Sequence, residues 1–191
     1  MKRILPLAAL LMAIGSFLLV KIASAPADPP ENTAHVGDDG AVKLTGKNTT
    51  IAFIGTKPGG MHNGGFKTFD GTIKVADGRI SSISVNIDTA SLWADDPKLT
   101  AHLKTPDFFD AKKYPKATFA STKIEKENVT GDLTLHNVTK SITFPVTLIN
   151  EKGNFTLTSS FKIDRTDFKM NFGQGKVDNE VTINVTVGKS K

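Results

Sequence analysis

Few side chains in this sequence are suited to metal or nucleophilic chemistry, and their spacing fits no common catalytic motif. The four histidines, His35, His62, His102 and His136, are far apart, and none forms an HExxH or HxH pair of metal ligands. The chain has no cysteine and no G-x-S-x-G motif, so neither a thiolate nor an activated serine can be nominated. We therefore expect no metal, no catalytic residue and no enzymatic activity.

Two basic side chains, His102 and Arg165, are candidates for contacting the polar head of a ligand. His102 follows Asp95 and Asp96 at i+7 and i+6, close to two helical turns. It could meet these carboxylates or a head group, and a hydrogen bond at a helix end is the plainer interpretation. Arg165 lies between two aspartates just past an apolar strand, where it could receive an anionic or carbonyl head group or form a structural ion pair.

Other polar motifs have structural explanations. Asp107 and Asp110 flank two phenylalanines like an acid/base pair, but Asp107 directly follows Pro106 and is expected to cap a short helical turn. The glycine pairs at 59–60 and 64–65 lack the Lys-Ser/Thr of a phosphate loop and predict a flexible hairpin. The alternative function is that of an enzyme. Such an enzyme would have only His102, Asp95 and Arg165 as a polar cluster.

The elements that position these residues are mainly β-strands. Apolar and polar residues alternate with period two from about residue 41, as in half-buried strands. Ile73 and Val85 belong to two such runs, joined by Asp77-Gly78, a dipeptide typical of a tight hairpin. The pattern predicts eight or nine strands in a closed barrel or a sandwich, and closure would remove exposed sheet edges.

One segment breaks the alternation and predicts a short helical insertion over about residues 92–111. Leu92, Leu99 and Leu103 have roughly helical spacing, Pro97 suits a first helical turn, and Pro106 ends the segment. Between hairpins, such an insertion could cover one mouth of a barrel.

The N-terminal 27 residues have the layout of a secretory signal. Lys2 and Arg3 precede an apolar run over residues 4–20, followed by small residues. This run of 17 residues exceeds the usual signal length of roughly 7 to 15 and falls short of the about 20 of a spanning helix. We expect a cleaved leader and a periplasmic or secreted protein, with a retained membrane anchor as the alternative.

Residues 28–40, rich in Pro, Gly and acidic residues, predict a linker, so the domain is expected to span 41–191. The net charge of +5 falls to +2 without Lys2, Arg3 and Lys21, which leaves 21 basic against 19 acidic residues. The charges are interspersed, so no nucleic-acid partner is expected.

Several motifs around the insertion resemble one known family. Its pattern is matched in order and spacing by Asp96, His102-Leu103-Lys104, Asp107-Phe108-Phe109-Asp110, Tyr114-Pro115, the stretch from Gly131 to Lys140, and Arg165-Thr166-Asp167-Phe168. The chain is identified on these motifs as similar to the YceI family. It departs from the family pattern at Asn137, where Gly is usual, and at Lys169-Met170 after Phe168.

The resemblance implies an all-β, eight-stranded antiparallel barrel of lipocalin-like shape, exported, with a long-chain isoprenoid or other amphiphilic lipid inside. The alternating pattern alone favours a filled core, as in a non-ligand structural module, and the resemblance favours a cavity instead. On this basis the residues expected to bind the apolar ligand are Phe53, Phe69, Ile73, Val85, Ile87, Trp93, Leu103, Phe108, Phe119, Leu133, Leu135, Phe144, Val146, Leu157, Phe161 and Phe168. No cofactor is expected beyond a bound isoprenoid or fatty-acyl lipid, transient membrane contact is expected, and the oligomeric state, a dimer among the options, is left open.

Overall fold

The computed structural model describes residues 33–151 and 154–188, which fold almost entirely into antiparallel strands. Three short helices interrupt the strands: η1 (Thr89–Ser91), α1 (Pro97–Leu103) and η2 (Arg165–Phe168). The strands are β1 (Ala34–His35), β2 (Ala41–Leu44), β3 (Thr49–Lys57), β4 (Gly60–Phe66), β5 (Phe69–Ala76), β6 (Arg79–Asp88), β7 (Leu92–Ala94), β8 (Lys116–Glu125), β9 (Asn128–Leu135), β10 (Val138–Pro145), β11 (Thr147–Glu151), β12 (Asn154–Asp164) and β13 (Glu180–Val187).

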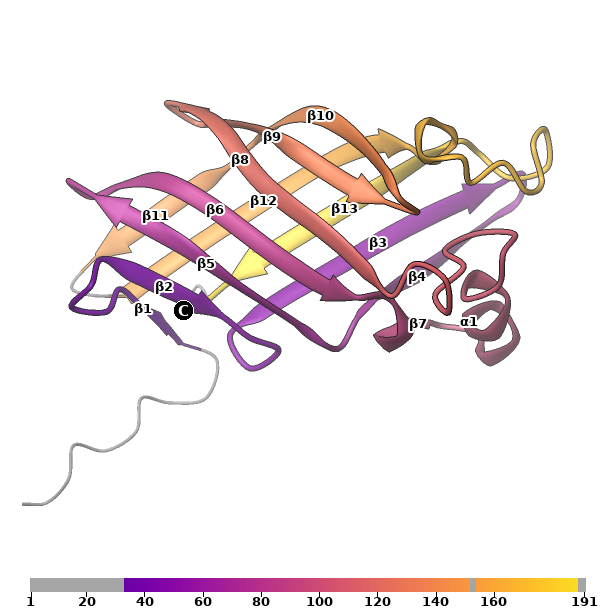
Figure 1. The fold of residues 1–191 in the computed structure, drawn as a ribbon, viewed down its shortest axis with the longest axis horizontal. Coiled ribbons are helices and arrows are strands. Elements are labelled where there is room, and N and C mark those ends of the chain that lie inside the picture. The colour runs from indigo at the N-terminus through magenta and orange to yellow at the C-terminus, as the bar shows by residue number, and fades with distance from the viewer. Residues whose placement is uncertain (1–32, 152–153, 189–191) are drawn as a thin grey trace, which may run out of the picture.

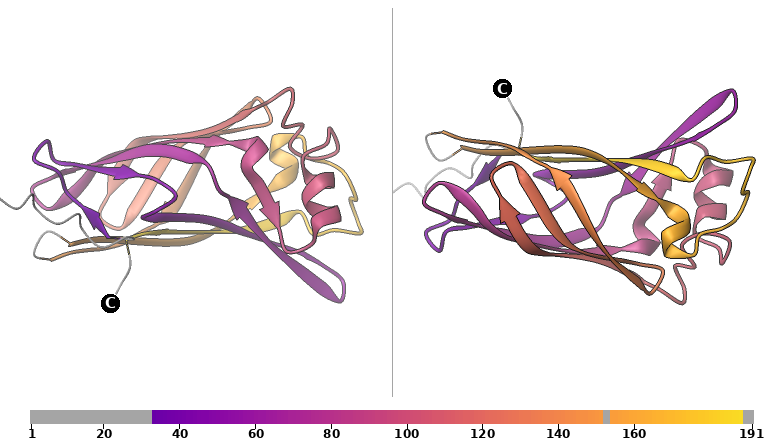
Figure 2. Two further views of the ribbon diagram at one scale, coloured as in Figure 1. Left: turned by 90° about the horizontal axis from the view of Figure 1, so that it is seen from below. Right: turned by 90° about the horizontal axis from the view of Figure 1, so that it is seen from above.

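The strands form two sheets that face each other (Figures 1 and 2). One sheet has the order β1-β12-β13-β3-β4-β7, with β11 also paired to β12, and the other has the order β10-β9-β8-β6-β5-β2. The short helix α1 lies at one end of this pair of sheets (Figure 1). The prediction of an all-β antiparallel fold with a short helical insertion is thereby confirmed.

Backbone pairing does not close the sheets into the expected single ladder of eight strands. At one boundary the chain bends from β10 into β11 at Pro145 and Val146, passing from one sheet to the other. Pro145 still pairs with Asn128 of β9, but it has no N–H to donate to a further strand on its other side. Alternation of apolar residues specifies which face is buried but not whether the last strand pairs with the first.

The turns follow from residues that tolerate positive φ. Asp77 and Gly78 join β5 to β6 with φ of 51° and 72°, as a two-residue hairpin turn requires. The predicted hairpin is thus confirmed. The predicted terminal strand is β13, which lies in the middle of its sheet between β12 and β3.

The helical insertion is shorter than predicted. Residues 92–94 form the strand β7 against β4, and only Pro97–Leu103 is α-helical. Asp96 caps the start of α1, accepting a hydrogen bond from the Leu99 backbone N–H at 2.8 Å, and Pro97 occupies the first turn. The leucine spacing misled the prediction because Leu92, although it packs in one buried cluster with Leu99 and Leu103 of α1, lies in the strand β7.

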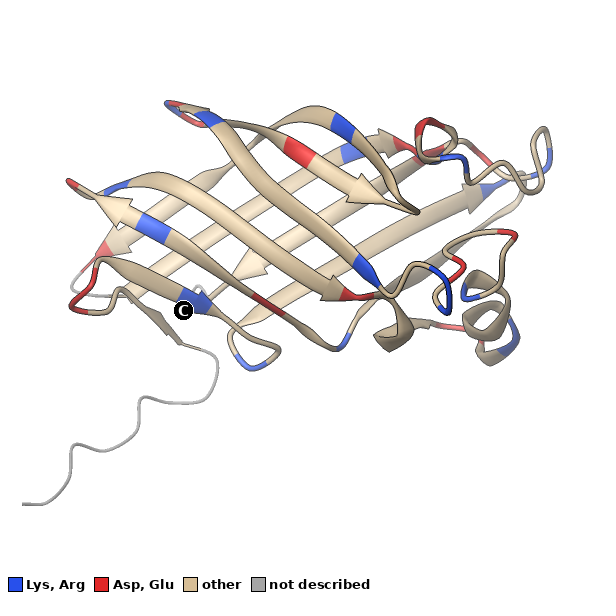
Figure 3. Ribbon diagram, in the orientation of Figure 1, with Lys and Arg blue, Asp and Glu red and all other residues tan. Residues whose placement is uncertain are grey.

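The predicted linker and leader fall at or beyond the edge of the described residues. Ala34 and His35, within the expected linker, pair with Phe155 and Asn154 of β12. The predicted signal peptide, residues 1–27, lies outside the described residues. Among residues 33–151 and 154–188, no helix is long and apolar enough to cross a membrane. Charged residues of both signs are mixed along the strands and loops (Figure 3).

Candidate functional site

An apolar cavity of about 220 Å³ lies between the two sheets. Only three polar side chains, Thr49, Ser159 and Arg165, are among its lining residues. An apolar cavity of roughly 150 Å³ stays dry and binds benzene, so this one has room for about ten carbons. The interior is therefore not a completely filled core.

Twelve of the sixteen apolar residues predicted to bind ligand line this cavity. They are Phe53, Ile73, Val85, Ile87, Leu103, Phe108, Phe119, Leu133, Leu135, Phe144, Leu157 and Phe161. Arg165 also lines it, whereas His102 does not. The structure places these residues around the cavity, and their role in binding a ligand stays a prediction.

Four predicted residues lie elsewhere. Val146 and Phe168 are buried in the core clusters beside the cavity, with 4% and 1% of their surface exposed. Trp93 lies in β7 opposite Gly65, and Phe69 begins β5 and is half-buried. These residues are apolar like the others, and only the packing decides which ones face a void.

The prediction missed much of the wall contributed by β13. Val181, Ile183, Val185 and Val187 all line the cavity. They share one strand face, so the same alternation that identified the strand could have assigned them to the lining. Phe109, which also lines the cavity, lies in the turns after α1, where no periodicity indicates the direction of a side chain.

Two glycines leave room for phenyl rings of neighbouring strands. A Cβ atom at Gly131 would be 2.4 Å from the Phe119 ring, and one at Gly64 would be 2.3 Å from the Phe53 ring. Any larger residue at either glycine would push these rings toward the lumen. Phe119 then contacts Phe144, at a ring-centroid distance of 5.3 Å.

Arg165 lies at the cavity with 4% of its surface exposed, and it is bonded to backbone. Its Nε donates to the Asp178 carbonyl at 3.1 Å, and Nη1 donates to the Met170 carbonyl. Nη2 donates to the Val177 carbonyl at 3.2 Å and to Asn179 Oδ1 at 3.3 Å. All four acceptors lie in the loop between η2 and β13, so the guanidinium holds this loop in place. Burial lowers the pKa of Arg165.

His102 belongs to a cluster beside one end of the cavity. Its Nε2 lies 2.8 Å from Asp107 Oδ2, so Asp107 pairs with His102 instead of capping a helical turn as predicted. The imidazole also packs edge-on against Phe108 and Phe172, with centroid distances of 5.1 and 4.7 Å. Phe108 lines the cavity, so this cluster covers that end.

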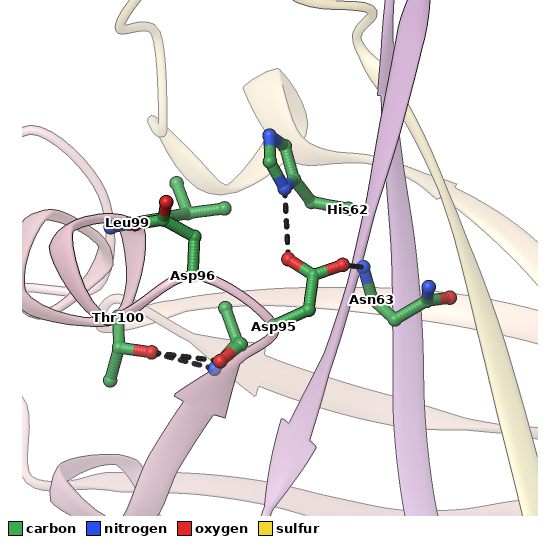
Figure 4. A network of polar contacts seen from close by, with 7 residues as sticks. His62, Asn63, Asp95, Asp96, Leu99 and Thr100 are labelled. Carbon is green, nitrogen blue, oxygen red and sulfur yellow. Dashed lines mark hydrogen bonds and ion pairs between the residues drawn. The ribbon is translucent and has the colours of Figure 1, made fainter.

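Asp95 pairs with His62, not with His102. Asp95 Oδ1 lies 2.8 Å from His62 Nδ1, and Oδ2 accepts the Asn63 backbone N–H at 2.8 Å (Figure 4). The Asn63 hydrogen bond, followed by the one from His62, lowers the pKa of Asp95. These contacts fasten β4 to the segment that precedes α1.

The polar cluster considered for catalysis is not assembled. Across the described residues, no hydrogen bond or ion pair joins His102, Asp95 and Arg165 to one another. Nor does any group of three metal-ligating side chains occur within residues 33–151 and 154–188. What the described part of the chain offers a ligand is an apolar enclosure.

The comparisons with known proteins agree with this architecture. A family model described as the YceI-like domain matches residues 43–188. A UPF0312 protein of Pseudomonas putida strain W619 is 36% identical over 140 residues, covering 65% of this chain and 71% of its own. Protein YceI of Escherichia coli O17:K52:H18 strain UMN026 is 32% identical over 138 residues, with the same two coverages.

Solved structures share the fold. The crystal structure of BcnA of Burkholderia cenocepacia has a TM-score of 0.69 at 25% identity, covering 77% of this chain and 99% of its own. A polyisoprenoid-binding domain of Saccharophagus degradans, implicated in plant cell wall breakdown, has a TM-score of 0.58, covering 83% and 99%. Its identity of 13% shows likeness of fold alone. Because the family model spans most of the described residues, the chain belongs to the YceI-like domain family.

Proposed function

We propose that this protein binds a long apolar molecule, an isoprenoid or a related lipid, between its two sheets and carries or stores it outside the cytoplasm. The observation that carries the proposal is the cavity of about 220 Å³, whose lining is apolar except for three side chains. The structural likeness to a polyisoprenoid-binding domain supports the same class of ligand.

The energetics favour a hydrocarbon ligand that needs few polar contacts. Burial contributes about 0.8 kcal/mol for each CH₂, so ten buried carbons contribute about 8 kcal/mol. Before the cost of association is subtracted, this corresponds to a Kd of about 1 μM. A longer chain would bind more tightly only where the protein makes room for it.

The location outside the cytoplasm is supported by the sequence of residues 1–27, with its basic start and apolar run. A lipid of this class resides in membranes, so a carrier has to contact a membrane transiently to load or unload. The proposal involves no nucleic acid and no catalytic step.

Organic extraction of the purified protein, followed by mass spectrometry, tests the proposal. We expect a hydrocarbon-rich lipid in about stoichiometric amount, and the extracted protein should take up an apolar fluorescent probe. Repeated recovery of no lipid, together with no probe uptake, would rule the proposal out.

A pair of matched substitutions tests whether the probe binds in the cavity. Leu133 lines the cavity, whereas Leu148 is also partly buried against the core but does not line it. L133W should reduce probe binding at least tenfold by filling the lumen, and L148W should change it less than twofold. Equal effects of the two tryptophans would place the probe outside the cavity.

A further inference from the structure

The boundary between β10 and β12 is closed by side chains and not by a backbone ladder. β11 pairs with β12 in a register that sets Thr147 opposite Thr158, and continuing this register would set Phe144 opposite Phe161. Within the described residues, however, no backbone pairing joins β10 to β12. At Pro145 the contact is made by a side chain, since Ser159 Oγ donates to the Pro145 carbonyl at 2.6 Å.

Two further contacts of side chains close this boundary, which we call the seam. The rings of Phe144 and Phe161 stack across it with centroids 4.4 Å apart and an interplanar angle of 14°. Beyond them, His136 Nδ1 donates to the Phe168 carbonyl at 3.2 Å and joins the end of β9 to η2. Parting the seam between these contacts would break no backbone hydrogen bond.

The seam opens directly onto the cavity, because Phe144 and Phe161 both line it. Each of these residues has a ladder partner on its other side, Val129 for Phe144 and Ile183 for Phe161. The strands that bear the two rings are therefore fixed to their own sheets. Rotation of the two rings would expose the lumen without unfolding either sheet.

The opposite boundary between the sheets is held more firmly. There the chain itself crosses between the sheets from β2 to β3, from β4 to β5 and from β6 to β7. The backbone N–H of Lys67 donates to the Ser91 carbonyl at 3.3 Å, and that of Asp88 donates to the Thr68 carbonyl at 3.0 Å. These two hydrogen bonds extend the β4–β7 and β5–β6 ladders into the connections, so opening this side would bend paired segments. At the seam the chain also crosses, from β10 to β11, but no ladder joins β10 to β12 beside that crossing. The seam is therefore the weaker boundary.

We propose that the seam is a lateral gate, through which a chain-like apolar ligand enters and leaves, with Phe144 and Phe161 as the gating side chains. This inference rests on the proposed function and adds a route to it. The cavity has room for about ten carbons, and parting of its walls would supply the further space that a longer chain needs. Opening of the seam would make this space along the length of the bound hydrocarbon chain. The stacked rings of Phe144 and Phe161 are the main obstacle to such opening.

Reversible cross-linking tests the gate. The chain has no cysteine, so in the double variant F144C/F161C the two introduced thiols have only each other to pair with. The probe is a pyrene-labelled hexadecyl chain, and its release into phosphatidylcholine vesicles is followed by stopped-flow fluorescence. We expect release from the oxidised variant to be at least tenfold slower than from the same variant after reduction. If the direct disulfide does not form, a bifunctional methanethiosulfonate reagent bridges the same thiols.

The control is a cross-link across neighbouring strands that are already hydrogen-bonded. Thr130 and Thr143 face each other in the β9–β10 ladder with their hydroxyl oxygens 2.8 Å apart, and neither lines the cavity. Oxidation of T130C/T143C should change the release rate less than twofold.

The outcomes separate the gate from the proposed function. Equal release rates for oxidised and reduced F144C/F161C, with the probe bound in both, would overturn the gate and leave lipid binding intact. Failure of the wild-type protein to bind the probe at all would remove the proposed function, and the gate with it.

Discussion

Arg165 shows that a buried cation beside an apolar cavity need not be a ligand group. Its guanidinium donates to four acceptors of the loop between η2 and β13, three of them backbone carbonyls. A planar group with five fixed donors suits this task better than a lysine, whose ammonium is a compact point charge. Arg165 therefore acts mainly by fixing the shape of the cavity wall.

Replacing Arg165 should destabilise the fold. R165M would leave buried carbonyls without donors, and we expect the free energy of unfolding to fall by about 2–4 kcal/mol. Urea denaturation measures this change, and limited proteolysis should show faster cleavage between residues 170 and 179. R79M, at the exposed start of β6, is the control and should change stability by less than about 0.5 kcal/mol. An unchanged midpoint for R165M would contradict the structural role.

The glycines beneath the phenyl rings give a second prediction for single residues. In G131A the new methyl group would meet both the Phe119 ring and the Ala120 carbonyl oxygen, which is 2.5 Å from the Cβ position. Such overpacking should cost about 1–3 kcal/mol of unfolding free energy. Gly55 also lines the cavity but has no atom within 4 Å of its Cβ position, so G55A should cost far less. Equal losses in thermal denaturation would disprove the packing argument.

Among the elements, the short helices depend on aspartate caps. Asp96 caps α1, and Asp164 caps η2 by accepting from the Thr166 hydroxyl at 2.6 Å and from its backbone N–H at 2.8 Å. The hydroxyl contact, followed by the backbone one, lowers the pKa of Asp164 in the folded protein. Since η2 begins with Arg165, this cap also fixes the backbone of Arg165, from which the guanidinium extends.

The depressed pKa of Asp164 predicts a pH dependence of stability with a definite sign. The unfolded carboxyl binds a proton near the ordinary value of 3.8, and the folded one does so only at lower pH. The stabilisation is therefore complete above this range and is lost as the pH falls through the folded value. D164N keeps an acceptor but removes the charge, so its urea midpoint should fall less than that of the wild type between about pH 5 and pH 2.5. Parallel losses in the two proteins would show that another group is responsible.

At this scale the sequence predicted strand positions better than strand partners. The β5–β6 hairpin was predictable because Asp77 and Gly78 select their turn locally. The extent of α1 was overestimated because Leu92 suits a helix face and a buried strand equally well. The unpaired seam was not predictable, since it depends on how β10 and β12 meet after the chain has folded.

For the whole molecule, the cavity couples ligand binding to stability. The two sheets enclose the void between them, so a ligand held there stabilises the folded state and has little affinity for the unfolded chain. At a concentration 100 times its Kd, a ligand stabilises the folded state by about 2.7 kcal/mol. If the protein binds a ligand as proposed, its empty and loaded forms should differ in stability by about this amount.

We therefore expect organic extraction to lower the melting temperature by roughly 5–10 °C and readdition of lipid to restore it. Differential scanning fluorimetry with an added hexadecyl-chain lipid measures the shift. L133W, whose lumen is filled, is the control and should show little response to lipid. If added lipid leaves the melting temperature of the wild-type protein equally unchanged, that result would argue against a ligand held between the sheets.

The sequence by itself determined the all-β class, the terminal strand, the tight β5–β6 turn and the family to which the chain belongs. These features depend on neighbours along the chain: alternation selects strands, turn residues select hairpins, and motifs retain their spacing. Together with the family resemblance, the same local patterns selected twelve of the residues that line the cavity, including Phe53, Phe119 and Phe144.

Only the tertiary structure decided that the interior retains a cavity, that Arg165 binds backbone, and that His102 pairs with Asp107. Alternation assigns a side chain to the inside but cannot tell whether opposing side chains meet there. Whether they meet depends on the spacing of the two sheets and on glycines opposite the rings, such as Gly131 beneath Phe119. Those are distances between residues remote in sequence, which exist only once the chain has folded.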